Sequence, residues 1–399
     1  MMLNSLPSLY QEIEMELKEN ILPFWIEHSV DRTNGGFYGF ITNDLDVNED
    51  AEKGCILNSR ILWTYSKAYR TYDDERYLEM ATHAFQFVKN AFLDKEYGGL
   101  YWMVDSKGVP VEDRKHIYNQ AFGIYGLTEY YMATKEQESL KLAIQLYELI
   151  EKYAYDKENK GYFEAFTREW QTDEDLRLSG KDLNTPKSMN THLHILEAYT
   201  NLYRVWKDEQ FKEKVKELII VTLEHIVSGE AQFKLFFDEK WNSKSNIISY
   251  GHDIEGSWLL YEATEVIEDM ELLMTVKSIV IAMAKKVLEE GLDKDGSVIN
   301  ERENEHIDKD KIWWVQAEAM VGFFNAYQLT SDRAYVETVN RIWAFTKKYI
   351  IDQTNGEWFW KREANLEISN MPKVEPWKCP YHNSRFCFEM LARIKEMTK

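Results

Sequence analysis

The segment GGFYGFITND (residues 35–44) is followed along the chain by five segments of similar composition. They are GGLYWMVD (98–105), GYFEAFT (161–167), AQFKLFFD (231–238), GSVINERE (296–303) and GEWFWKRE (356–363). With Phe37, Leu100, Tyr162, Phe233, Val298 and Trp358 as reference positions, the successive spacings are 63, 62, 71, 65 and 60 residues. Each segment reads as a turn followed by a short strand or hairpin. The chain is therefore predicted to consist of six repeats of about 64 residues.

Each repeat has room for two helices, and the sequence between the aromatic segments has helical periodicity. One set of predicted helices is amphipathic with a charged far face, at roughly 5–28, 75–93, 136–154, 209–228, 270–290 and 332–350. The other set is richer in apolar and small residues all round, as buried helices are, and begins near Leu57, Tyr118, Met189, Gly251, Trp313 and His382. All 7 prolines lie outside 187–371, which suits long helices joined by tight turns. Thr134 and Gln137 have the spacing of a capping box for one amphipathic helix.

These features predict an all-α fold, an (α/α)6 barrel of six helical hairpins with short β-hairpins in the connecting loops. An open solenoid is the structural alternative. Closure is favoured because six hairpins are few for a solenoid and neither end of the sequence has a polar capping repeat. We expect the whole chain, 1–399, to be one catalytic domain.

Composition and charge narrow the classes of function. A formal net charge of −20 argues against nucleic acid and anionic membrane surfaces as partners. The sequence has no long apolar run, and its first residues lack the order of a secretory signal, so a cytoplasmic protein is expected. Three cysteines, Cys55, Cys379 and Cys387, have no paired metal spacing. Aromatic residues make up 14% of the chain, a density often found where side chains line carbohydrate sites.

Polar and aromatic residues recur at the starts of the predicted inner helices. In a closed barrel these N-termini converge at one mouth, where free amides and positive potential favour oxygen-rich ligands. The residues are Asn58 and Arg60; Tyr118 and Gln120; Asn190, His192 and His194; His252 and Glu255; Trp314 and Glu318; and Trp377 and His382. Spacings of three or four place Asn190 with His194, His252 with Glu255, and Trp314 with Glu318 on shared faces. His192 points elsewhere and is interpreted as structural.

Three histidines from different inner helices, His194, His252 and His382, can bind a metal or act as acid and base. No cysteine or cluster of aspartates completes a metal site, so the second interpretation is preferred. Inverting a carbon beside a carbonyl requires removing its proton from one face and returning a proton to the other. Two bases on opposed helices are suited to that reaction.

Six motifs also closely resemble cellobiose 2-epimerases, within the N-acylglucosamine 2-epimerase superfamily. They are KGCILNSRILW (53–63), YNQAFGIYGLTEYY (118–131), KSMNTHLHILEAYTNLYR (187–204), SYGHDIEGSWLL (249–260), KIWWVQAEAMVGFFNAY (311–327) and VEPWKCPYHNSR (374–385). The resemblance extends from about residue 10 to the C-terminus. It implies an (α/α)6 barrel that interconverts glucose and mannose at the reducing end of β-1,4-linked disaccharides, without metal or redox cofactor.

The same resemblance implies roles for individual residues. His252 and His382 are implied to be the acid/base pair at carbon 2, and His194 to assist ring opening and closure. Substrate-binding roles are implied for Arg60, Tyr118, Asp182, Asn190, Glu255, Trp314, Glu318 and Trp377. Of these, Glu255 and Glu318 would orient or bind. Arg60 and Asn190 would bind the carbonyl and enediol oxygens, and the two indoles would stack on sugar rings.

Rival functions remain open at this point. A glycoside hydrolase on the same barrel would use Glu255, Glu318, Asp182 or Asp253, but would leave the histidines idle. A sister isomerase would act on N-acetylglucosamine or mannose, and a non-catalytic barrel would only bind sugar. Protonation at carbon 1 would add aldose–ketose isomerisation, giving lactulose from lactose. The only partner expected is a small-molecule sugar, with a monomer as the default oligomeric state.

Overall fold

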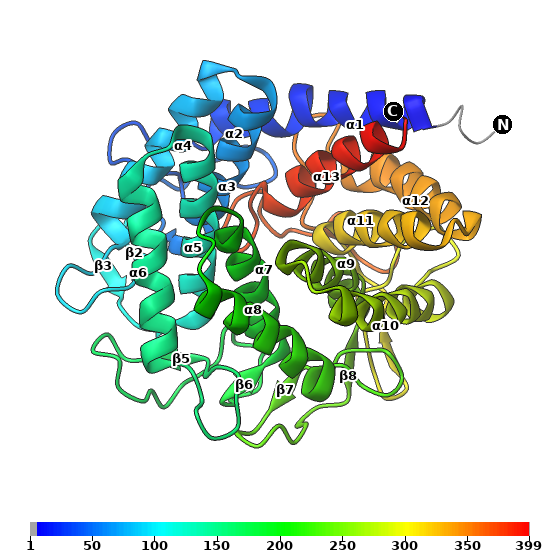
Figure 1. The fold of residues 1–399 in the computed structure, drawn as a ribbon. Coiled ribbons are helices and arrows are strands. Elements are labelled where there is room, and N and C mark those ends of the chain that lie inside the picture. The colour runs from blue at the N-terminus through cyan, green and yellow to red at the C-terminus, as the bar shows by residue number, and fades with distance from the viewer. Residues whose placement is uncertain (1–5, 399) are drawn as a thin grey trace.

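The computed structural model describes residues 6–398, which form a ring of alternating inner and outer helices (Figure 1). The inner helices are α3 (Cys55–Tyr72), α5 (Ile117–Thr134), α7 (Met189–Val205), α9 (Tyr250–Ile267), α11 (Trp313–Thr330) and α13 (Tyr381–Met397). Every predicted inner helix is present and begins within two residues of its predicted start. These helices are buried along most of their length, as their apolar composition predicts.

The outer helices surround them, and several contain a π-helical turn. They are α1 (Leu6–Met15) with η1 (Glu16–Ile21) and α2 (Leu22–His28); α4 (Glu75–Phe87) with η2 (Val88–Phe92); α6 (Gln137–Tyr153); α8 (Glu209–Val221) with η3 (Thr222–Ile226); α10 (Met270–Glu290); and α12 (Arg333–Phe345) with η4 (Thr346–Ile350). All predicted outer helices are confirmed. The predicted start of the first at residue 5 lies outside the described residues.

The ring is closed. Each inner helix packs on the next one along the chain, and α13 packs on α3 as well as on α11. The two ends of the chain also meet, because α13 lies against α1 (Figure 1). The (α/α)6 barrel is confirmed, and the open solenoid is excluded.

Short β-structure joins the hairpins at one end of the ring. All reference positions of the repeat form antiparallel bridges to a residue one or two positions after the preceding outer helix: Val30 with Phe37, Leu93 with Leu100, Tyr155 with Tyr162, Val227 with Phe233, Leu292 with Val298 and Ile351 with Trp358. The strands are β1 (Lys53–Gly54), β2 (Met103–Val104), β3 (Pro110–Glu112), β4 (Lys115–His116), β5 (Ala165–Phe166), β6 (Lys187–Ser188), β7 (Phe236–Phe237), β8 (Ile247–Ser249), β9 (Glu301–Glu303), β10 (His306–Asp308), β11 (Lys311–Ile312) and β12 (Lys361–Arg362).

The strand pairing links neighbouring hairpins all the way round the ring. Strands that lead into an inner helix pair with a strand of the following repeat, as β1 with β2, β4 with β5, β6 with β7, β8 with β9 and β11 with β12. A bridge between Ile41 and Val374 joins the first repeat to the last. The strands therefore fix the N-terminal ends of the inner helices relative to one another.

Glycines in the turns permit close packing at this end. Gly161 has a φ of +73°, and a Cβ there would lie 2.4 Å from the ring of Trp241. Any other residue would meet both the strain of the left-handed region and this steric overlap.

Buried ion pairs reinforce the loops, and the sequence analysis did not anticipate them. Lysines two residues before inner helices bind aspartates that follow outer helices: Lys53 with Asp31 (2.6 Å), Lys115 with Asp94 (2.9 Å), Lys187 with Asp156 (2.7 Å) and Lys311 with Asp293 (2.7 Å). Lys373, in the longer loop before α13, binds Asp352 in the same way. The hairpin of α9 has Ile248 and Ser228 at the corresponding places. Both partners of the ion pair are thus replaced together in the repeat that contains His252.

The capping box predicted from Thr134 and Gln137 is wrong. Thr134 is the last residue of α5, and its hydroxyl donates to the carbonyl oxygen of Tyr130 (2.8 Å). Lys135 then takes a left-handed conformation that ends α5, and the carboxylate of Glu136 caps α6 by accepting from the backbone of Glu138. Two residues thus suffice for the turn between an inner and an outer helix.

In residues 6–398 no helix combines the length and the apolar character needed to span a bilayer.

Candidate active site

A cavity of about 400 Å³ opens where the N-terminal ends of the inner helices converge. Most of the predicted site residues line it: Arg60, Tyr118, Asp182, Asn190, His194, His252, Glu255, Trp314, Trp377 and His382. They come from every inner helix and from the loops that precede α7 and α13. The repeat therefore brings together side chains that are more than 300 residues apart in sequence.

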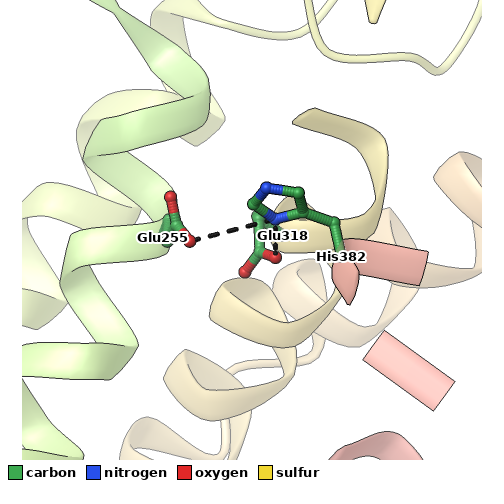
Figure 2. Close-up of side chains that lie close together, drawn as sticks. All are labelled: Glu255, Glu318 and His382. Carbon is green, nitrogen blue, oxygen red and sulfur yellow. Dashed lines mark hydrogen bonds and ion pairs between the residues drawn. The ribbon is translucent and has the colours of Figure 1, made fainter. Parts of the chain in front are cut away.

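Glu318 is the one member of the predicted set that does not line the cavity. It is fully buried behind His382, where its Oε1 accepts from the ring nitrogen Nδ1 at 2.7 Å (Figure 2). Glu255 lies 4.0 Å from the same nitrogen. Glu318 is therefore placed to orient His382, which is one of the two roles implied for it, and it does not line the cavity where a ligand would bind.

His252 and His382 both lie close to one indole. The ring of Trp314 lies 4.7 Å from the ring of His252 and 5.5 Å from that of His382, measured between centroids. Burial lowers the pKa of His252 to about 3, with a smaller contribution from His194. Burial and then Arg60 also lower the pKa of His382 well below its usual value. Both imidazoles are therefore neutral near pH 7 and able to accept a proton.

His194 has a carboxylate partner of its own. Its Nδ1 lies 2.9 Å from Oε2 of Glu197, one turn further along α7, and both side chains are buried. The ring packs against Tyr118 and Phe122, with centroids 4.9 Å away in each case. The Nδ1 atom of His194 is thus occupied, and the ring edge that faces the cavity holds Nε2.

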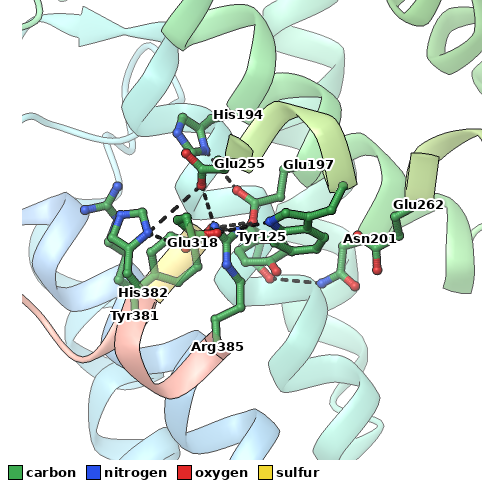
Figure 3. Close-up of polar contacts among 12 residues, drawn as sticks. Tyr125, His194, Glu197, Asn201, Glu255, Glu262, Glu318, Tyr381, His382 and Arg385 are labelled. Atoms are coloured by element: carbon green, nitrogen blue, oxygen red, sulfur yellow. Dashed lines mark hydrogen bonds and ion pairs between the residues drawn. The ribbon is translucent and has the colours of Figure 1, made fainter. Parts of the chain in front are cut away.

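Arg385 connects these groups beneath the cavity (Figure 3). Its guanidinium binds the carboxylates of Glu197, Glu255 and Glu318, the last at 2.7 Å, and all four side chains are buried. Tyr381 donates its hydroxyl hydrogen to Glu197. Arg385 therefore supports the partners of both His194 and His382 from one position on α13.

The charges of these carboxylates reflect that arrangement. Burial raises the pKa of Glu197, but Arg385 and His194 outweigh it and lower the pKa to about 2. Burial, followed by repulsion from Glu318, raises the pKa of Glu255 to about 7 despite Arg385. Glu197 is thus a fixed anion, whereas Glu255 titrates near neutral pH.

Sequence reasoning missed Arg385 and Glu197. Arg385 ends the motif VEPWKCPYHNSR and stands three residues after His382, so both lie on one face of α13. Glu197 stands in the same relation to His194. This shared spacing of three is the signal that could have identified them.

Arg60 places a cation at the cavity wall. Its guanidinium donates to the hydroxyl of Tyr118 at 2.7 Å and to the carbonyl oxygen of Trp377 at 3.4 Å. It also lies over the rings of Phe122 and Tyr381, 4.1 and 4.9 Å from their centroids. A guanidinium held by neutral groups keeps its charge available for an anionic oxygen in the cavity.

Neutral and acidic oxygen atoms face the same space. The amide oxygen of Asn190 is buried and has no hydrogen-bond partner within residues 6–398. Asp182 accepts from the backbone N–H of Ser179 at 2.9 Å, and burial raises its pKa. Trp377 contacts the ring of Tyr118 at a centroid distance of 5.9 Å. The cavity thus offers oxygen atoms that can accept hydrogen bonds from the hydroxyl groups of a ligand, beside aromatic faces.

The group Glu255, Glu318 and His382 has the spacing of a possible metal site, with ligand atoms within 4.8 Å of one another. Arg385 already binds both carboxylates, and Glu318 already bonds Nδ1 of His382. A divalent ion would have to displace this guanidinium. The donor set is thus a poor fit to a metal, because its charge is balanced by the protein.

His192 is structural, as its direction on α7 predicted. Its ring is buried, with Nδ1 2.6 Å from the carbonyl oxygen of Ser188 and Nε2 accepting from the backbone of Tyr162 at 2.8 Å. Gln120, Asp253 and Gln316 make the equivalent bonds to Leu100, Phe233 and Val298. Side chains at this position fasten these four turns to the next inner helix.

A larger cavity, about 1070 Å³, lies at the opposite end of the ring between the C-terminal ends of the inner helices. Its charged side chains pair with one another, as Arg204 does with Glu262 (2.8 Å) and Arg393 with Glu389 (3.2 Å). The lining described by the structure contains no histidine. The chemistry therefore points to the smaller cavity at the N-terminal ends.

Comparison with known proteins agrees with this geometry. A family model described as N-acylglucosamine 2-epimerase matches residues 36–384. The cellobiose 2-epimerase of Bacteroides fragilis is 46% identical, and the match covers 96% of this chain and 99% of the relative. That of Dictyoglomus turgidum is 45% identical over 97% of this chain and 99% of the relative. The solved structure of cellobiose 2-epimerase from Bacillus thermoamylovorans superposes with a TM-score of 0.93 at 46% identity, covering 97% of this chain and 100% of that one. The chain belongs to the N-acylglucosamine 2-epimerase family.

Proposed function

We propose that this protein is a cellobiose 2-epimerase, which inverts carbon 2 of the reducing-end sugar in β-1,4-linked disaccharides such as cellobiose and lactose. The observation that supports this most directly is the pair of neutral imidazoles, His252 and His382, which line one cavity together with Trp314. Relatives with the same name at 45–46% identity along almost the whole chain support the assignment of substrate.

The first chemical step removes the proton from carbon 2 of the open-chain sugar. His194, at the cavity wall beside Tyr118, assists ring opening. One imidazole takes the carbon-2 proton, and the electron pair of that C–H bond forms a double bond to carbon 1. The carbonyl oxygen becomes negative, and Arg60 stabilises it. The product of this step is a planar enediolate beside a new imidazolium.

The second step returns a proton to the opposite face. Rotation about the bond between carbons 2 and 3 turns the enediolate toward the other imidazole. That ring is neutral at the start, and it takes up a proton from solvent because the negative charge of the intermediate favours its protonated form. It gives its proton to carbon 2, the carbonyl re-forms, and both histidines recover their initial protonation by exchange with solvent. Protonation at carbon 1 instead gives the ketose, so lactulose is an expected side product from lactose.

The rival glycoside hydrolase needs two carboxyl groups on either side of a glycosidic bond. Glu318 does not line the cavity, and both Glu255 and Glu318 are bonded to Arg385. Neither could protonate a leaving group while a second carboxylate attacks from across the bond. The buried guanidinium therefore argues against hydrolysis by this pair.

Turnover in heavy water tests the function. Incubation with lactose or cellobiose should give the 2-epimer with deuterium at carbon 2, because the proton held by a histidine exchanges with solvent before it returns. Mass spectrometry and NMR of the product measure the label. A strong chelator in the same assay should leave the rate unchanged.

Other products would contradict the proposal in recognisable ways. Release of a monosaccharide would indicate hydrolysis. Turnover of N-acetylglucosamine or mannose, with none of either disaccharide, would indicate a sister activity on the same barrel. An epimer formed without any solvent label would exclude proton transfer through exchangeable histidines.

Trp377→Ala should weaken productive binding of the disaccharide. An indole provides a flat apolar face for a sugar ring, and its loss removes packing area together with positioning. We expect KM to rise at least about tenfold and kcat to fall, as steady-state kinetics with cellobiose would measure. Trp170→Phe, on a stacked pair with Tyr153 away from the cavity, is a matched control. Wild-type kinetics in Trp377→Ala would remove this indole from the substrate site.

A further inference from the structure

Ser249 is the side chain that holds the ring of His252. Its Oγ lies 2.8 Å from Nδ1 of His252, and Ser249 is fully buried. The other ring nitrogen, Nε2, is therefore the one left to face the cavity that His252 lines. The ring of His252 is thus held by this hydroxyl at Nδ1 and by packing against Trp314.

The position of Ser249 makes this contact informative. It is the N-cap residue of α9, where a serine hydroxyl normally accepts a hydrogen bond from the first turn of the helix. Ser188 holds the same position on α7 and accepts from the backbone N–H of Thr191 at 3.2 Å. Ser249 makes no such capping bond. Its hydroxyl bonds the imidazole of His252 and does not cap the helix.

His382 has a different kind of partner. The carboxylate of Glu318 can only accept a hydrogen bond when ionised, so it holds the hydrogen of His382 on Nδ1. A hydroxyl group can donate or accept. His252 is therefore held at the same ring nitrogen as His382, but by a neutral group.

We propose that Ser249 is a positioning residue for proton transfer, whose hydroxyl oxygen accepts the Nδ1 hydrogen of His252 and so keeps Nε2 as the atom that exchanges a proton with carbon 2. The inference rests on the proposed function. Nδ1 bears a hydrogen in both states that the reaction uses, the neutral base with a free Nε2 and the imidazolium that donates from Nε2. An acceptor at Nδ1 suits both states.

Loss of the hydroxyl should affect catalysis through the tautomer of one ring. Without an acceptor at Nδ1, neutral His252 can place its hydrogen on Nε2 and can no longer take a proton there. The same tautomer error underlies the large loss seen when the aspartate of a catalytic triad becomes asparagine. Proton exchange at carbon 2 should slow strongly only for the epimer whose carbon-2 proton His252 removes.

Ser249→Ala tests the inference by proton exchange measured separately on the two epimers of the disaccharide. In Ser249→Ala we expect kcat to fall at least about tenfold while KM stays within about twofold of the wild-type value. Exchange of the carbon-2 proton with solvent should slow for one epimer, the same epimer that loses exchange in His252→Asn. Exchange from the other epimer should stay near the wild-type rate. Nitrogen-15 NMR of labelled histidine should show His252 changing from the Nδ1–H to the Nε2–H tautomer. Ser249→Thr, which restores a hydroxyl, should recover the lost exchange.

Ser188→Ala is the matched control at the same N-cap position. Removing a true cap should lower the melting temperature while leaving the ratio of the two exchange rates unchanged. Equal slowing of both epimers in Ser249→Ala, or an unchanged tautomer, would overturn the positioning role. If wild-type enzyme itself exchanged no carbon-2 proton, the proposed function would fail instead, so the two failures are distinguishable.

Discussion

His252→Asn and His382→Asn should each lower turnover of cellobiose by at least about 100-fold, and up to about 10,000-fold, while the fold persists. A positioned acid or base contributes this much to proton transfer. Asparagine keeps much of the size and some of the hydrogen bonding of histidine, but it cannot take up or release a proton near neutral pH. Steady-state kinetics measure the loss, and circular dichroism checks the fold.

The two variants should also differ from each other. If the rings face opposite sides of carbon 2, the surviving histidine can still remove and return the proton on its own face. Each variant should then exchange the carbon-2 proton of one epimer with solvent without inverting it, and the two variants should retain opposite epimers. Exchange measured separately from the glucose and mannose epimers in heavy water would show this pattern.

His306→Asn serves as the control, because His306 lies on the exposed hairpin of β9 and β10 and should keep wild-type rates for both epimers. Near-normal epimerisation in either active-site variant would contradict the two-base assignment. Equal residual exchange from both epimers in both variants would do so as well.

The fold was predictable because a local pattern repeats. The aromatic segments around Phe37 and its counterparts each form the same bridge, and the helical periodicity between them set both helices of every hairpin. Closure followed from the number of repeats. Turn chemistry was less predictable: Thr134 lost its expected capping role because α5 extends to include it.

Most cavity residues were predictable for the same reason, since the repeat places them near the start of an inner helix. Asp182 and Trp377 lie in the loops before α7 and α13, and only the family resemblance pointed to Asp182. The partners of the cavity residues were not predictable. Arg385 binds carboxylates 67 to 188 positions away in sequence, and Ser249 is told apart from Ser188 only by what its hydroxyl contacts. Such contacts form only when the ring closes and brings distant helices together. A local sequence pattern does not predict them.

Arg385→Met should lower the free energy of unfolding by about 3–5 kcal/mol near neutral pH, because it leaves three buried carboxylates without their cation. Methionine approximates the length of the side chain, so the loss reflects charge more than volume. Activity should fall with it, since Glu197 and Glu318 hold His194 and His382. Urea unfolding followed by fluorescence measures the change. Arg76→Met, at an exposed pair with Asp74, should stay close to wild type.

The loss should depend on pH in a definite direction. Arg385 and His194 together lower the folded-state pKa of Glu197 from 4.5 to about 2, so this carboxylate stabilises the fold above about pH 4.5 and loses that contribution as pH falls toward 2. The shift corresponds to about 3 kcal/mol.

Without Arg385, burial raises the pKa of Glu197, and those of Glu255 and Glu318 rise further above their unfolded values. Each carboxylate must then be protonated or remain an unpaired anion, and protonation becomes harder as pH rises. The destabilisation should therefore be smaller at about pH 5 than at about pH 8. A penalty that is equal at both pH values, or larger at pH 5, would show that Arg385 acts through packing and not through the charges of these carboxylates.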